Sequence, residues 1–339
     1  MRRNRREGLI WGLAAGVAIA FTALWIRQGH RRRLALAAQI GEMTQQAVDQ
    51  LGVPAQSTTL TVNGLHLHAV VAGPEGGPLV VLLHGFPENW TAWRHSFKPL
   101  VDAGYRVIAL DQRGYSLSDK PAGIHNYRLD ALAADVREVI RASGRETAMI
   151  VGHDLGGSVA WQTAMDYPDI VDKLIIMNSP HPAAFAREVR ENPAQRQRLW
   201  YWLFFQLPWL PELMLGQSPL DTVNLFFRLG AVNRNAYSSY DLHLLAASMS
   251  QPGALTAMLN YYRAVFRHKP AGITRVTKTP TLIIWGEDDV VLGKSLTYGI
   301  GQWVPNVQIH YVPNCGHWVQ NEAADKANSA MLAFLQPHS

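Results

Sequence analysis

Short apolar runs, each ending at a Gly, Asp, Asn or Pro, recur along the chain from residue 58 onward. Buried strands of a parallel sheet show this pattern, because both faces of such a sheet are covered. Segments with helical periodicity separate the runs, which is typical of strands joined by crossover helices. The pattern predicts strands within residues 79–85, 105–111, 147–154, 173–180, 281–289 and 307–313.

Two segments depart from this rhythm. Residues 59–73 read TLTVNGLHLHAVVAG, which predicts a hairpin that turns at Asn63-Gly64. From His181 to about Gly272 the pattern becomes helical, and this stretch carries fourteen of the 32 aromatic residues of the chain. We interpret it as a helical cap inserted over the carboxyl ends of the strands, where open α/β sheets place their sites.

The chain is therefore predicted to adopt an α/β fold, with a mostly parallel sheet flanked by helices and an inserted helical cap. The core would comprise residues 58–181 and 273–339, and the cap residues 182–272. Residues 34–57 would form a linker to an Arg-rich N-terminal segment, residues 1–33.

The excess positive charge of the chain lies at the N-terminus. The chain has 339 residues and a formal net charge of +5, but residues 1–33 hold eight Arg and one Glu, so residues 34–339 carry −2. Without a basic stripe elsewhere, nucleic acid is not expected as a partner. A single cysteine, Cys315, excludes an internal disulfide and a cysteine cluster for metal.

The N-terminal segment holds eighteen uncharged residues, Leu9–Ile26, between two Arg clusters. As a helix this stretch would be about 27 Å long, enough to span a bilayer. It predicts a single-pass membrane anchor at residues 9–26 and a membrane localisation. A cleaved signal peptide is the alternative, because residues 18–20 resemble a cleavage site. The Arg clusters on the two sides balance, so the orientation stays open.

Candidate chemistry begins with MIVGHDLGGSVAW, residues 149–161. An apolar strand, a glycine-flanked turn and a helix start form the elbow that lifts a nucleophile out of the backbone. The lifted residue is Asp154. A carboxylate is already charged at neutral pH and can attack a saturated carbon directly, giving an ester. The competing interpretation is a carboxylate that only caps the helix.

Polar residues also follow other predicted strands, in the motifs HGFP, GEDD and CGHW. Nucleophile, acid and histidine come in the order of an α/β-hydrolase triad. We predict that His317 is the base for the water that hydrolyses the ester and that an acid orients it. Asp289 is the preferred acid, and Asp288 is the alternative.

The chain resembles the epoxide hydrolases of the α/β-hydrolase superfamily over about residues 58–335, which implies the α/β-hydrolase fold. Six motifs in order carry this resemblance: HGFPENW, DQRGYS, GHDLGG, NSPHP, GEDDVVL and NCGHW. The resemblance implies that an epoxide is hydrolysed to a vicinal diol through an alkyl ester on Asp154. Water activated by the His317–Asp289 pair would hydrolyse this ester. Backbone N–H groups of Phe86 and Leu155 would hold the oxyanion that forms in this step.

The resemblance also implies two cap tyrosines that protonate the departing epoxide oxygen. LNYYR places one at Tyr262 and YWLFFQ places the other at Tyr201, with Tyr261 still possible as a partner. Trp90 and Trp202 are expected to bind the substrate, which the aromatic cap suggests is a small apolar epoxide.

Two other functions stay open. Leu155 stands where many relatives have a Trp that binds halide, which argues against a haloalkane dehalogenase. A fluoroacetate-type dehalogenase is harder to exclude, because the cap has Trp200, Trp202 and Trp209. A non-catalytic binding protein would be expected to have lost one of the triad residues.

No cofactor and no metal are expected. The chain has no glycine-rich nucleotide fingerprint in the right context and no H-E-x-x-H motif. The oligomeric state and the particular epoxide stay open.

Overall fold

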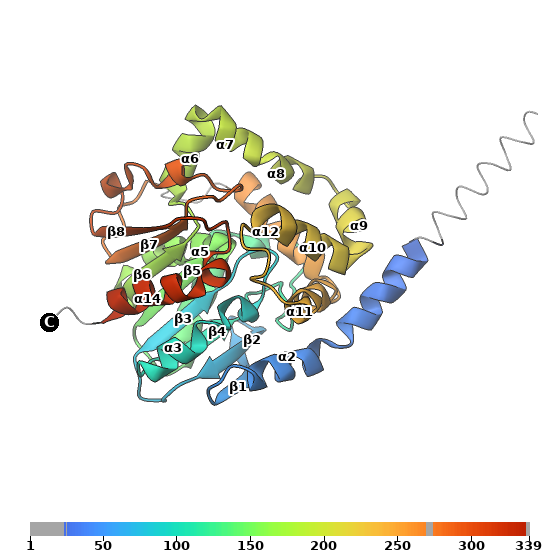
Figure 1. Cartoon of the computed structure of the whole chain (residues 1–339), viewed down its shortest axis with the longest axis horizontal. Coiled ribbons are helices and arrows are strands. Elements are labelled where there is room, and N and C mark those ends of the chain that lie inside the picture. The colour runs from blue at the N-terminus through green and yellow to red at the C-terminus, as the bar shows by residue number, and fades with distance from the viewer. Residues whose placement is uncertain (1–23, 25, 269–273, 337–339) are drawn as a thin grey trace, which may run out of the picture.

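An eight-stranded sheet organises the computed structural model, which describes residues 24, 26–268 and 274–336 (Figure 1). The strand order is β1-β2-β4-β3-β5-β6-β7-β8, and every pair from β4 to β8 is parallel, whereas β2 pairs antiparallel with both β1 and β4. The strands are β1 (Ala55–Val62), β2 (Leu65–Ala72), β3 (Leu79–Leu83), β4 (Arg106–Leu110), β5 (Ala148–His153), β6 (Val171–Met177), β7 (Thr281–Gly286) and β8 (Val307–Val312). The predicted fold class is confirmed.

The hairpin between β1 and β2 turns where the sequence predicted. Val62 pairs with Leu65, and Asn63 and Gly64 connect them with φ of 51° and 73°. A two-residue turn of this kind needs positive φ at both positions, which Asn and Gly tolerate best.

Helices cover both faces of the sheet: α3 (Phe97–Asp102) and α14 (Ala324–Leu335) on one, α4 (Leu129–Ala142) and α5 (Asp154–Asp166) on the other. Neighbouring side chains of one strand point to opposite faces. Val81 of β3 accordingly packs in the cluster that contains α4 and α5, and Leu82 packs in the cluster that contains α3 and α14. This two-sided burial explains why the strands are apolar throughout. Further short elements are α2 (Ile40–Asp49), α13 (Val319–Glu322) and 3₁₀ turns at Trp90–Trp93, Ile124–Tyr127, Pro168–Ile170, Lys294–Thr297 and Ile300–Gln302.

The predicted cap interval, between β6 and β7, is helical in the structure. Figure 1 shows its helices grouped together beside the sheet. They are α6 (Pro182–Glu191), α7 (Pro193–Arg198), α8 (Trp200–Phe205), α9 (Leu210–Gly216), α10 (Pro219–Gly230), α11 (Ser239–Met249) and α12 (Ala254–Arg267). Residues 269–273, where the cap was predicted to end, lie outside the described residues.

The predicted linker contains ordered elements of the fold. Residues 34–57 include the end of a helical segment at 26–37, the whole of α2 and the start of β1. Ile40 of α2 packs with Leu244 and Ala247 of α11, and the Tyr240 hydroxyl donates to the Met43 carbonyl. These contacts attach α2 to the cap.

The prediction of a transmembrane anchor at residues 9–26 is contradicted. None of the helices in the described part of the chain is both long enough and apolar enough to cross a membrane. Of the predicted anchor, only Leu24 and Ile26 belong to the described residues. The helical segment at 26–37 carries four arginines at 27, 31, 32 and 33, and each would be costly in hydrocarbon. The predicted membrane localisation is corrected with the anchor. Nothing in the described residues tests the predicted membrane partner.

Helix α5 approaches the end of β3 so closely that one position of its first turn has no room for a side chain. A Cβ on Gly156 would lie 2.2 Å from the Leu83 carbonyl oxygen and 2.4 Å from the His84 carbonyl oxygen. Both atoms belong to the backbone, so they cannot move aside without shifting β3.

We therefore expect Gly156→Ala to destabilise the fold by about 1–3 kcal/mol, as overpacking does elsewhere. Gly41→Ala is the control, because a Cβ on Gly41 in α2 meets nothing within 4 Å. Ala at such a helix position should stabilise by about 0.5–1 kcal/mol. Urea unfolding with an unchanged m-value measures both effects. Equal unfolding midpoints for the two variants would show that the contact is not tight.

Candidate active site

Asp154 occupies a strained turn between β5 and α5. Its φ is +49°, in the left-handed region that residues other than glycine rarely adopt. The facing loop also approaches closely, since a Cβ on Gly85 would lie 2.5 Å from the Cβ of Asp154. The elbow geometry predicted from residues 149–161 is therefore present. It holds the Asp154 carboxylate away from the backbone of its own strand.

Two groups meet the two oxygens of this carboxylate. The Phe86 N–H donates to Oδ1 at 3.0 Å, and His317 Nε2 lies 3.6 Å from Oδ2. Leu155 begins the first turn of α5, where backbone N–H groups have no partner within the helix. The loop after β3, the elbow and the loop after β8 thus converge on one carboxylate.

The acid beside His317 is Asp289. Its Oδ2 lies 2.7 Å from His317 Nδ1, while its Oδ1 accepts from the N–H groups of Val291 and Leu292 at 2.7 and 2.8 Å. Asp288 is exposed, and its N–H donates to the Cys315 carbonyl. Of the two acids that the sequence left open, only Asp289 contacts the histidine.

Two residues that the sequence analysis missed support this pair. Asn178, fully buried, donates from Nδ2 to Asp289 Oδ2 at 2.7 Å and accepts the Gly286 N–H at Oδ1. Its place directly after an apolar run, in NSPHP, was the available signal. Glu322 accepts N–H groups from both sides of His317, from Gly316 and Trp318, each at 3.1 Å. No local pattern marks Glu322.

Glu322 also reaches the cap. Its Oε2 accepts the N–H groups of Val232 and Asn233, which follow α10, at 2.7 and 3.0 Å. One carboxylate therefore holds the His317 loop and a cap segment together.

The charges of Asp154, Asp289 and His317 stabilise one another. Burial alone would lower the pKa of His317, but the carboxylates of Asp289 and Asp154 outweigh it and raise this pKa well above 6.5. Burial alone would raise the pKa of Asp154, but the hydrogen bond and charge of His317, with smaller contributions from His153 and the Phe86 N–H, lower it. In the free protein Asp154 is thus a carboxylate and His317 an imidazolium.

Tyr201 of α8 and Tyr262 of α12 lie together above this site. Their ring centroids are 6.0 Å apart, and the Tyr262 ring is 5.5 Å from that of Phe86. Burial first, and then the negative charge of Asp154, raises the pKa of both phenols. Both hydroxyls therefore stay protonated. Tyr261 points elsewhere, since its hydroxyl donates to the Arg113 carbonyl at 2.7 Å.

The predicted substrate-binding tryptophans are placed differently. The Trp202 ring lies 5.4 Å from that of Tyr262. Trp90 is fully buried in the cluster on the opposite face of the sheet, where it packs against Phe97. Trp200 and Trp209 are each 68% exposed. The Trp200 ring still lies 6.5 Å from that of Tyr201, edge to face. The exposure of Trp200 and Trp209 weakens the case for a halide site built from all three cap tryptophans.

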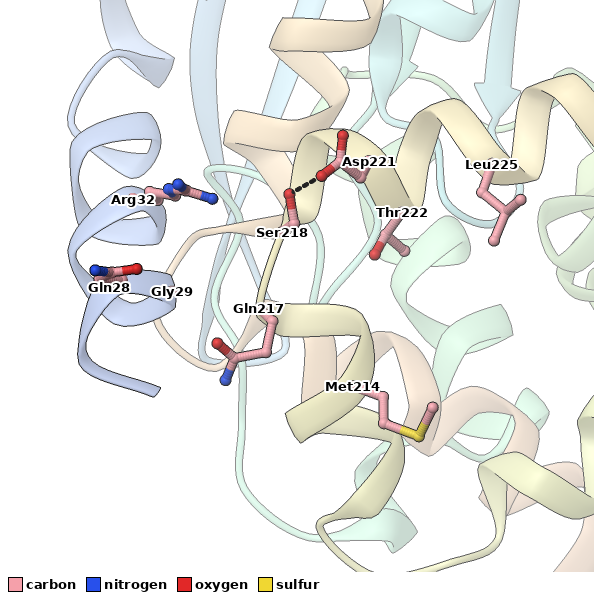
Figure 2. Close-up of a pocket in the computed structure, with 9 residues that line it drawn as sticks. All are labelled: Gln28, Gly29, Arg32, Met214, Gln217, Ser218, Asp221, Thr222 and Leu225. Atoms are coloured by element: carbon pink, nitrogen blue, oxygen red, sulfur yellow. Dashed lines mark hydrogen bonds between the residues drawn. The ribbon is translucent and has the colours of Figure 1, made fainter. Parts of the chain in front are cut away.

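A hollow of about 400 Å³ lies elsewhere on the surface, between the helical segment at 26–37 and helices α9 and α10 (Figure 2). Gln28, Arg32, Met214 and Asp221 are among its lining residues, and it shares none with the site around Asp154. Within the described ranges, no group of three His, Cys, Asp or Glu side chains is arranged to hold a metal ion.

Comparison with known proteins identifies the class. A family model described as the α/β hydrolase fold matches residues 78–324. The AB hydrolase superfamily protein YfhM of Bacillus subtilis is 42% identical, over 82% of this chain and 96% of the relative. Sequence, sheet and elbow together define an α/β hydrolase.

Relatives that are named as epoxide hydrolases define a narrower family within this class. Epoxide hydrolase 4 of Mus musculus is 38% identical, over 81% of this chain and 77% of the relative. The crystal structure of a Bacillus megaterium epoxide hydrolase in complex with an inhibitor superposes with a TM-score of 0.76 at 33% identity, covering 82% of this chain and 99% of that one. The chain belongs to the epoxide hydrolases of the α/β-hydrolase superfamily, which confirms the resemblance found in the six motifs.

The charged Asp154–His317 pair predicts a pH-dependent stability. His317 has a raised pKa when folded, so its contribution is complete below its unfolded value of about 6.5 and is lost as pH rises toward the folded value. Wild-type stability should therefore fall above pH 6.5 by up to about 1.4 kcal/mol per pH unit relative to His317→Gln. Urea unfolding of both proteins from pH 6 to 9 measures the difference. A constant difference across this range would contradict the pairing.

Proposed function

We propose that this protein hydrolyses an apolar epoxide to a vicinal diol through a covalent ester on Asp154. The observation that carries the proposal is the convergence of the Asp154 carboxylate with His317 Nε2 at 3.6 Å and the Phe86 N–H at 3.0 Å. A capping role for Asp154 would not require a histidine–acid pair on its other side.

In the first step, a carboxylate oxygen of Asp154 attacks an epoxide carbon. The carbon–oxygen bond of the epoxide breaks, and its electrons move to the departing oxygen. That oxygen needs a proton, which Tyr262 or Tyr201 donates. The raised pKa of both phenols keeps the proton available before the reaction begins.

Alkylation then prepares the second step. The ester has no negative charge, so His317 loses one of the two carboxylates that raise its pKa. Its pKa therefore falls and its proton leaves to solvent, from which the tyrosine phenolate regains the proton it gave. The neutral imidazole can then accept a proton from water while Asp289 stabilises the imidazolium that forms. The base thus becomes competent only after the ester exists.

Water attacks the carbonyl carbon of Asp154 itself. The resulting oxyanion is held by the N–H groups of Phe86 and Leu155, and the first of these already contacts Oδ1. Collapse of the intermediate breaks the bond between this carbon and the diol oxygen, and the His317 imidazolium protonates that oxygen. The diol leaves, and the carboxylic acid left on Asp154 gives its proton to His317, which restores the carboxylate and the imidazolium.

The surroundings favour an apolar substrate. Aromatic rings of the cap and of Phe86 pack around Tyr262: the centroids of Phe205, Trp202 and Phe86 lie 5.0, 5.4 and 5.5 Å from it. Such walls bind apolar groups and exclude water from the ester.

Removing the base should trap the ester. His317→Gln should still be alkylated and should accumulate up to one equivalent of adduct, whereas Asp154→Ala should form none. Both should lose turnover by about 10⁴-fold or more, as members of one catalytic unit do. Intact-protein mass spectrometry after incubation with styrene oxide measures the adduct. His310→Gln, at an exposed position of β8, is the control for changing a histidine. An adduct on Asp154→Ala would place the nucleophile elsewhere.

Removing the proton donors should slow only the first step. Tyr262→Phe should slow alkylation by up to about 10²-fold, and combination with Tyr201→Phe should slow it further. Tyr261→Phe is a matched control, since it changes the adjacent residue of the same helix but removes a hydrogen bond to Arg113 instead. Single-turnover alkylation rates distinguish the three. Unchanged rates in the double variant would refute the tyrosine assignment and leave Asp154 in place.

A further inference from the structure

Directly behind the nucleophile lies a buried pair that the proposed steps do not use. His153 precedes Asp154, and its Nδ1 lies 2.9 Å from Glu88 Oε2. Its Nε2 lies 3.0 Å from the backbone carbonyl oxygen of His317. Both side chains of the pair have no exposed surface. His153 thus joins the nucleophile elbow to the loop that carries the base.

Hydrogen-bond accounting assigns the protons of His153. A carbonyl oxygen can only accept, so Nε2 must carry a hydrogen. Nδ1 faces a carboxyl oxygen, so the second proton lies between Nδ1 and Glu88 Oε2. The remaining question is whether it belongs to the imidazole or to the carboxyl group.

Other donors around Glu88 answer this question. Arg94 donates to Asn321 Oδ1. The amide oxygen of Asn321 therefore faces Arg94, and its amide nitrogen faces Tyr237 and Glu88. The Tyr237 hydroxyl accepts from that nitrogen at 2.9 Å and therefore donates its own proton to Glu88 Oε1, also at 2.9 Å. Gln320 Nε2 adds a contact at 3.2 Å to Oε2. Several donors that converge on one carboxyl group stabilise its ionised form.

We propose that Glu88 and His153 form a buried carboxylate–imidazolium pair that acts as a positioning unit for the proposed Asp154 chemistry. Its N–H group holds the His317 loop, and its positive charge lies next to the nucleophile. A Cβ on Gly85 would lie 2.8 Å from Asp154 Oδ1 and 3.0 Å from His153 Nδ1. Because both atoms lie so near this one point, the imidazolium is a close neighbour of the carboxylate. The pair therefore favours the ionised nucleophile. Glu88 lies beyond the imidazole and compensates its charge.

The pair also connects to the cap. Tyr237 lies between α10 and α11, and its ring centroid is 4.1 Å from that of Phe227 of α10, with the two rings tilted by 44°. The titratable and charged groups that face the pair are Asp154, His317, Tyr237, His84, Tyr115 and, through Asn321, Arg94. Of these, Asp154 and His317 are the groups whose charges the proposed chemistry uses.

Glu88→Gln tests the charge without breaking the network. The new amide oxygen can accept from Tyr237 and Asn321, and the amide nitrogen can donate to Nδ1 of a neutral His153. Gln320 Nε2 loses its contact at the former Oε2 position and keeps only the longer one, 3.4 Å, at the former Oε1 position. The hydrogen bonds of His153, Tyr237 and Asn321 each keep a donor and an acceptor, but both charges are gone. Asp111→Asn is the matched control: His68 Nδ1 lies 2.8 Å from Asp111 Oδ2, this pair is also buried, and its carboxylate also receives a backbone N–H, from Trp90.

The protonation state can be measured in the resting enzyme, so this arm does not depend on the proposed function. With ¹⁵N-labelled histidine at pH 8, we expect His153 to show hydrogens on both ring nitrogens, and Glu88→Gln to remove the one on Nδ1. Signals that disappear in His153→Asn identify the residue. A neutral His153 in the wild type would overturn the proposal.

The effect on the nucleophile is measured by the pH dependence of single-turnover alkylation with styrene oxide and a terminal alkyl epoxide. Loss of the neighbouring positive charge should raise the pKa of Asp154, so Glu88→Gln should move the acidic limb upward by about one pH unit. Asp111→Asn should leave it in place. An unmoved limb in Glu88→Gln would reduce the pair to a structural role and overturn the proposal. A wild type that forms no ester on Asp154 would instead refute the proposed function, and the histidine spectra would still decide the charge of the pair.

Discussion

A strained turn with no space around it is the constraint on which the active site depends. Asp154 keeps a positive φ because β5, α5 and the loop after β3 crowd it from three sides, and glycines at 85 and 156 are what permit that crowding. The turn points one carboxylate toward the ends of the neighbouring strands. The Phe86 N–H and His317, which meet this carboxylate, are placed by loops that begin where strands end, whereas Tyr201 and Tyr262 come from the cap. The sheet therefore sets the geometry around the carboxylate that we propose as the nucleophile.

Electrostatic balance is the second property of the site. Asp154 and Asp289 flank His317, and in the proposed pair Glu88 faces His153, so each of the two neighbouring histidines has an acidic partner. Buried charges are tolerated when each is paired and hydrogen-bonded. The proposed reaction changes this balance at a single place, when the ester forms on Asp154. The order of the two steps then follows from charge, because the base is released only after the nucleophile has been used.

The sequence could predict the features that depend on local patterns. The Asn63-Gly64 turn, the strands and the elbow follow from residues within a short window, and the order of the strand-end motifs indicated the family. Choices between neighbours could not be made, because Asp288 and Asp289, or Tyr261 and Tyr262, differ only in the direction imposed by the tertiary fold. Asn178, Glu322 and Glu88 were missed as partners because they contact residues far away in the chain. The anchor prediction took the arginine clusters on both sides of an uncharged run as support for a membrane span, but no helix in the described part of the chain is long and apolar enough for one.

The Glu322 carboxylate has a mechanical consequence. It joins the loop that carries His317 to the chain that leaves α10. This part of the cap therefore cannot move away without displacing His317. Any movement of the chain after α10 is therefore coupled to the position of the His317 loop, because both are held by the four N–H groups that one carboxylate accepts.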